Sequence, residues 1–152
     1  SDLHRRRVPS DAGSGEPMKL VLALALVLGL ALSINGLLML RDPLWWYGAV
    51  PTVPLSGPFN QHFVRDIGLM YVLTGVGFVV GALRPELRTP VWVAATAFHA
   101  LHGCLHVWET LVGICAPSTL ARDVPAVMTP VVVGIGLIAC AIRFPSGQLR
   151  SA

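Results

Sequence analysis

Residues 20–40, LVLALALVLGLALSINGLLML, decide the fold, because this run contains no ionisable side chain and is long enough to cross a membrane as a helix. Three further apolar runs follow at residues 63–83, 90–113 and 126–142. Each is close to the length of about 17 to 25 residues that a helix needs to span about 30 Å of hydrocarbon. None alternates in short stretches, as the strands of a transmembrane barrel do. The sequence therefore predicts an all-α polytopic membrane protein, a bundle of four transmembrane helices.

The composition excludes an ordinary soluble domain. Hydrophobic residues make up 54% of the chain and charged residues only 12%, which leaves little polar surface for a globule in water. We expect one transmembrane domain over residues 18–145, a disordered polar tail over residues 1–17, and a short C-terminal tail over residues 146–152. The first apolar run also resembles a secretory signal, whose removal would leave three helices.

Basic residues are distributed unevenly between the two ends of the predicted helices. If the N-terminus is cytoplasmic, most of the 11 lysines and arginines lie on that side, and only Arg41, Arg65 and Arg122 lie on the other. We therefore expect both termini to be cytoplasmic, in a bacterial inner membrane. This bias accounts for the net charge of +3, and we predict no nucleic-acid-binding patch.

The third apolar run ends in a polar stripe, within residues 98–109, FHALHGCLHVWE. On a helix, His99, His102, His106 and Glu109 fall within an arc of roughly 80°. An imidazole or carboxylate turned toward hydrocarbon costs several kcal/mol, so ionisable residues at this depth face the interior of a bundle and are candidates for function. The sequence therefore predicts a site along this stripe.

A second polar cluster begins the preceding helix, where His62 and Asp66 are spaced by four residues. Aligning the outer ends of the two helices puts Asp66 at the depth of His106 and Glu109. Imidazole and carboxylate ligands from paired helices suit zinc, copper or iron. We predict a metal ion bound by His102, His106 and Asp66, with Glu109 or His62 completing the ligand set. Glu109 is alternatively a partner that orients His106.

A structural role is the main alternative for the same residues. In this hypothesis Arg65 pairs with Glu109 or Asp66, and the histidines donate to neighbouring groups such as Tyr71 and Thr74. The network would then hold the helices in register.

Haem, quinone binding and proton transfer remain open. His99 or His102 could be an axial ligand of haem, so His99 is a candidate cofactor-binding residue, although two ligands at matching depth on different helices are not evident. Histidine titrates near neutral pH, which keeps proton transfer open.

Two short patterns resemble known membrane proteins. Residues 65–71, RDIGLMY, followed by Gly75, resemble the Arg-x-x-Gly-x-x-Tyr/Phe pattern of DoxX-like small four-helix membrane proteins. The run from GPFN at 57–60 through HFVRDIG at 62–68, with His102, His106 and Glu109, is similar to uncharacterised bacterial membrane proteins of about this length. The resemblance covers roughly residues 41–111. It implies a four-helix bundle associated with redox or quinone-linked membrane complexes, and a three-histidine stripe is not part of the DoxX-like pattern.

These observations favour an integral membrane protein with a pocket of His, Asp and Glu side chains near its outer face, between the second and third helices, that binds a transition metal in a redox-associated role. The alternative is a non-catalytic accessory or assembly subunit of a larger membrane complex, with the histidines as a structural network. Expected partners are the lipid bilayer and a larger complex or further copies of the chain. The sequence leaves open whether the protein is an enzyme.

Overall fold

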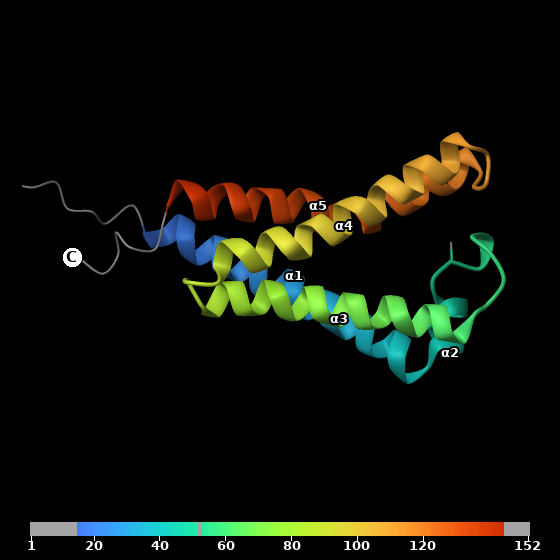
Figure 1. Ribbon diagram of the computed structural model, residues 1–152, viewed down its shortest axis with the longest axis horizontal. Coiled ribbons are helices and arrows are strands. Elements are labelled where there is room, and N and C mark those ends of the chain that lie inside the picture. Colours follow the sequence, from blue (N-terminus) through green and yellow to red (C-terminus); the bar gives the residue numbers. More distant parts are fainter. Residues whose placement is uncertain (1–14, 52, 145–152) are drawn as a thin grey trace, which may run out of the picture.

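A computed structural model of the chain describes residues 15–51 and 53–144, and within them the fold is helical without strands (Figure 1). The all-α class predicted from the sequence is confirmed. The elements are α1 (Gly15–Arg41), α2 (Pro43–Ala49), the 3-10 helix η1 (Val53–Leu55), α3 (Gln61–Leu83), α4 (Arg88–Leu111) and α5 (Pro117–Arg143).

Three helical segments are long and apolar enough to cross a membrane: Glu16–Arg41 in α1, Gln61–Leu83 in α3 and Val124–Arg143 in α5. These three agree with predicted spans and indicate a membrane protein. The fourth predicted span, now α4, has 24 residues and therefore sufficient length. It falls short in apolar character, because its histidines, threonines and terminal charges dilute its hydrophobic residues.

The helix boundaries differ from the predicted ones at both ends of the chain. α1 already begins at Gly15, so residues 15–17 of the predicted tail are helical, while residues 1–14 and 146–152 of the predicted tails lie outside the described residues. α5 begins at Pro117, well before the predicted start at residue 126. Proline suits the first turn of a helix, because its missing N–H has no partner there in any case.

The proline-rich segment between α1 and α3 is structured and contains the short helix α2. Asp42 accepts a hydrogen bond from the backbone N–H of Trp45 at 3.0 Å, which starts α2. The indole Nε1 of Trp46 donates to Asn35 Oδ1 of α1 at 2.9 Å, so the short helix is tied to the long one. Asn60 then caps α3 by accepting from the backbone N–H groups of His62 and Phe63. Side-chain hydrogen bonds thus fix the starts of α2 and α3.

α1 and α3 pack backbone against backbone. A Cβ added to Gly29 would lie 2.6 Å from the carbonyl oxygen of Gly75, and one added to Gly36 would lie 2.5 Å from that of Gly68. Only glycine permits such an approach at these crossing points. α1 packs more extensively on α3 than on any other helix, and α4 packs most extensively on α5, so the bundle consists of two helix pairs.

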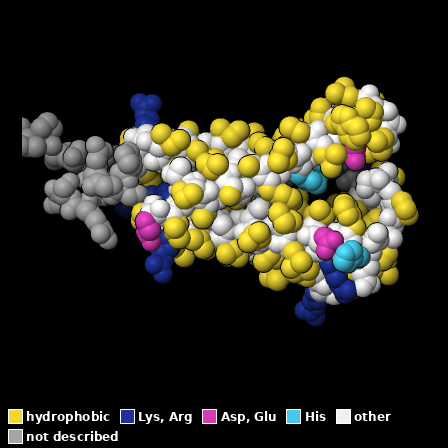
Figure 2. Space-filling view, in the orientation of Figure 1, with side chains coloured by type: hydrophobic (Ala, Val, Ile, Leu, Met, Phe, Trp, Pro, Cys, Tyr) yellow, Lys and Arg dark blue, Asp and Glu magenta, His cyan; other side chains and the backbone are white. Residues whose placement is uncertain are grey.

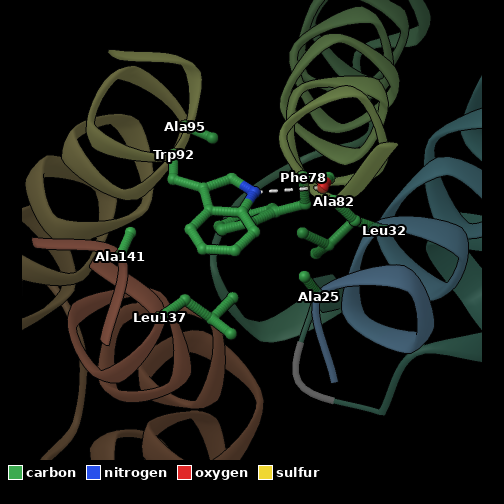
Figure 3. Close-up of a cluster of buried hydrophobic side chains, with 8 residues drawn as sticks. All are labelled: Ala25, Leu32, Phe78, Ala82, Trp92, Ala95, Leu137 and Ala141. Atoms are coloured by element: carbon green, nitrogen blue, oxygen red, sulfur yellow. Dashed lines mark hydrogen bonds between the residues drawn. The ribbon is translucent and has the colours of Figure 1, made fainter. Parts of the chain in front are cut away.

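The two pairs join around a buried tryptophan (Figure 3). Trp92 is fully buried, and its Nε1 donates to the carbonyl oxygen of Phe78 at 3.0 Å. All four long helices contribute to this core, which consists of Ala25, Leu32, Phe78, Ala82, Trp92, Ala95, Leu137 and Ala141. Arg88 closes it near the α3–α4 turn by donating from Nε to the carbonyl oxygen of Gly81 at 2.9 Å.

Away from this core the two pairs separate. Figure 1 shows α4 and the first part of α5 leaning together away from α1 and α3. We call this the wide end; it is where α1 and α4 finish and α3 and α5 begin. The opposite end, with the α3–α4 turn, is the narrow end.

Candidate functional site

The polar stripe of α4 faces the interior of the molecule, as the sequence predicts. His99 is 1% exposed, and His102, His106 and Glu109 are half-buried. The stripe starts where the packed core ends and continues toward the wide end. It therefore forms a line of polar groups that leads from the middle of the bundle to one of its ends.

His99 forms the deepest polar contact between α3 and α4. Its Nε2 lies 3.1 Å from Thr74 Oγ1, and that hydroxyl lies 2.9 Å from the carbonyl oxygen of Met70. Because the hydroxyl hydrogen is directed to a carbonyl, which can only accept, we assign Nε2 of His99 as the donor to Thr74. The Tyr71 ring packs edge-on against the imidazole at 5.4 Å between centroids. The predicted contact of a histidine with Thr74 is thus present.

His102 and His106 form a pair of adjacent imidazoles one turn nearer the wide end. Their ring centroids are 4.8 Å apart with the planes nearly perpendicular. On its other side, His102 stacks on Phe98 at 6.0 Å with the planes almost parallel. The two imidazoles therefore lie side by side on one helix, held in part by an aromatic neighbour.

The polar cluster at the start of α3 does not join them. His62 Nε2 lies 3.3 Å from Asp66 Oδ2, and the two side chains are 88% and 55% exposed. Within residues 15–51 and 53–144, no three His, Cys, Asp or Glu side chains are grouped so that they could hold a metal ion. The predicted ligand set of His102, His106 and Asp66 is thus not assembled in this structure.

Helix rotation explains this separation. Thr74 and Tyr71 mark the side of α3 that contacts α4. Asp66 precedes Thr74 by two turns plus a remainder, which places it about 80° around the helix from Thr74, on the side away from Tyr71. The prediction that Asp66 and His106 meet rested only on their similar depth along the bundle and did not include the rotation of the helices.

Arg65 and Glu109 also have partners other than those predicted. Arg65 Nε donates to the carbonyl oxygen of Leu40 at 3.3 Å and so satisfies a carbonyl in the last turn of α1. Glu109 Oε2 lies 3.8 Å from Cys115 Sγ in the connection to α5. No spacing signal in the sequence marks this contact.

A hollow separates the two helix pairs at the wide end (Figure 2). Histidine and acidic side chains lie on both sides of it. Phe63, Ile67 and Tyr71, spaced four residues apart, lie on the side of α3 that Tyr71 turns toward His99. The hollow thus has imidazoles on its α4 side and, in addition to the histidine and acidic side chains there, aromatic and aliphatic groups on its α3 side.

One further polar group is buried beneath the stripe. Thr96 Oγ1 is the one buried side-chain nitrogen or oxygen among the described residues that has no hydrogen-bond partner. It packs against Gly134 of α5, where a Cβ would collide with the threonine. The residue therefore serves close packing between α4 and α5.

Comparisons with known proteins add no family to this description. No protein-family model, no curated protein and no solved structure matches the chain. The resemblance to DoxX-like proteins therefore stays a prediction.

Proposed function

We propose that the chain is a four-helix protein of the bacterial inner membrane with both termini in the cytoplasm. The three apolar segments support this topology. α4 would cross beside them because it packs against both α3 and α5 and its deepest polar residue, His99, is buried. Lys19, Arg84 and Arg143 lie toward the narrow end, which would then be the cytoplasmic end.

Within this topology, the His102–His106 pair supplies two ligands to a transition-metal ion, zinc, copper or iron, in a redox-associated role. The observation that carries this proposal is the 4.8 Å separation of the two ring centroids at the edge of the hollow. Two imidazoles at positions i and i+4 of one helix point to the same side, as a shared ion requires. The other ligands would come from a second molecule, because the described part of this chain offers no third donor beside them.

An incomplete ligand set suits an accessory subunit. The metal ion could be shared with a partner subunit, a second copy of the chain or a bound substrate. That second molecule would reach the ion through the hollow. Glu109 and the His62–Asp66 pair are the nearest remaining candidates within the chain, and each would have to leave a contact it makes here.

A purely structural role for the stripe is the second candidate. The hydrogen bond between His99 and Thr74 favours it, because this bond lies at the interface of the two helix pairs and needs no ligand. In that case the protein would be a non-catalytic assembly subunit.

The decisive experiment is metal analysis of protein purified without a histidine tag and offered zinc, copper and iron. The variants are the double substitution His102→Ala/His106→Ala and, as a matched control, His62→Ala, whose imidazole is exposed on the other helix pair. We expect a stoichiometric metal in wild type and in His62→Ala, and its loss in the double variant. Retention in the double variant, or no metal in any form, would exclude this site. A Soret band would identify haem instead.

A further inference from the structure

The connection between α4 and α5 carries an apolar surface at the wide end. Its members, which we call the tip, are Trp108, Leu111, Val112 and Ile114, with exposed fractions of 53%, 79%, 52% and 62%. The sequence has no charged residue from Thr110 through Ala121. Figure 2 shows hydrophobic side chains covering this part of the molecule. Such a surface is costly in water and indicates contact with lipid or protein.

The backbone N–H groups of the tip form hydrogen bonds within the chain and so do not need water as a partner. The N–H groups of Val112 and Gly113 donate to carbonyls of Trp108 and Thr110 at 3.0 and 3.3 Å. The next two, of Ile114 and Cys115, both donate to the carbonyl of Glu109, at 2.9 and 3.2 Å. Gly113 allows this turn by adopting a φ of +80°, a conformation that favours glycine. Four consecutive N–H groups thus have partners within the chain, which lowers the cost of placing this turn in a membrane.

The apolar surface continues down the outside of α4. Leu101, Leu105, Trp108 and Val112 follow one another at helical spacing on a side of α4 about 110° around the helix from the histidine stripe, and Leu101 and Leu105 are 72% and 47% exposed. A side of α4 that faces lipid along its length therefore reaches the tip without interruption. Tryptophan at the end of such a helix is typical of the membrane interface.

We propose that the tip inserts into the headgroup layer of the bilayer at the wide end. The depth follows from α5, whose apolar segment begins at Val124 although the helix begins at Pro117. The tip thus extends about 10 Å along the helix beyond that segment, at 1.5 Å per residue, which places it beyond the hydrocarbon core, at the outer part of the headgroup layer. The hollow would then open at the level of the headgroups. This inference rests on the proposed membrane topology and does not depend on metal binding.

Nitroxide labelling in lipid vesicles tests the insertion. In a background with Cys104, Cys115 and Cys140 replaced by serine, a spin label is placed at Ile114→Cys. Leu30→Cys, on the exposed side of the middle of α1, calibrates the hydrocarbon, and Glu86→Cys, in the α3–α4 turn, calibrates water. Collision rates with oxygen and with a neutral nickel chelate report the depth of each label.

We expect the label at residue 114 to collide with oxygen more often than with the nickel chelate, at a depth between those of the two calibrating labels. Collision mainly with the nickel chelate, as at residue 86, would place the tip in water and overturn the proposal. Low collision with both would mean that protein covers the tip, which would also overturn it.

A second measurement tests the insertion without a spin label, so a perturbation by the label cannot affect it. Tryptophan emission of the unlabelled protein is compared with that of Trp108→Phe in vesicles with and without phosphatidylcholine brominated near the headgroup. Insertion predicts that the emission assigned to Trp108 by difference is quenched by the brominated lipid. Unquenched emission from Trp108 would overturn the proposal independently of any cysteine substitution.

Discussion

His99 of α4 and Thr74 of α3 are joined by a hydrogen bond of 3.1 Å between Nε2 and Oγ1, at the depth where the packed core gives way to the hollow. On the narrow-end side of this bond, Trp92 fills the space between the two helix pairs. On its wide-end side, the two helix pairs lean apart (Figure 1). The bond therefore joins α3 and α4 at the boundary between the packed core and the hollow.

Removing the threonine hydroxyl should destabilise the protein. Thr74→Val keeps the shape but leaves the donor of His99 without a partner, and an unsatisfied buried donor costs about 1–3 kcal/mol. Unfolding measured in detergent should show this loss. The control is Thr110→Val, because Thr110 Oγ1 bonds only to the carbonyl of His106 in its own helix. Equal stability of Thr74→Val and wild type would show that the bond does not contribute.

The glycines of α3 should differ sharply in their tolerance of alanine. A Cβ at Gly75 would lie 2.6 Å from the carbonyl of Gly29 and against the hydroxyl of Ser33, whereas one at Gly77 would find ordinary contacts at 3.6 and 3.7 Å. Gly75→Ala should therefore cost about 1–3 kcal/mol through overpacking. Gly77→Ala should be neutral or gain about 0.4–1 kcal/mol, because alanine restricts the unfolded chain.

Thermal unfolding of the two variants side by side checks this contrast. The same destabilisation in both would indicate a general effect of alanine in α3 rather than close contact with α1.

The sequence predicts well what depends on position along one helix. The apolar run at residues 20–40 predicts α1, and the spacing of His99, His102 and His106 predicts their common side on α4. Both properties follow from the helical repeat alone. The coarse fold and the α4 half of the candidate site were therefore accessible without a structure.

What the sequence does not predict depends on how helices are rotated and tilted against one another. Asp66 has the depth expected from the chain, but it lies toward the flank of α3 and pairs with His62. Arg65 contacts the carbonyl of Leu40, a contact between distant segments that no local pattern encodes. The short helix α2 was not among the predicted elements; its one proline, Pro43, occupies the first turn, where proline is tolerated.

The core tryptophan should contribute more to stability than the surface tryptophans. Trp92→Ala removes a fully buried indole, its hydrogen bond to Phe78 and its contacts with all the other long helices, and such truncations cost about 3–5 kcal/mol. Trp45→Ala, at a position that is 56% exposed, should cost much less. Unfolding midpoints in the same detergent compare the two. Similar losses would contradict the placement of the core at the narrow end.

The structure and the sequence alone predict different ligand sets for the metal ion. In the structure, His102 and His106 are neighbours, while Asp66 is paired with His62 on the other helix pair. Single substitutions His102→Ala and His106→Ala should each lower metal affinity at least about 10-fold, because removing either leaves a single imidazole, and even a partner outside the ligand set is worth about 10- to 100-fold. Asp66→Asn should leave affinity unchanged. Calorimetric titration with zinc or copper measures all three variants. A loss in Asp66→Asn equal to that in His106→Ala would mean that the two helix pairs close when metal binds and bring Asp66 into the ligand set after all.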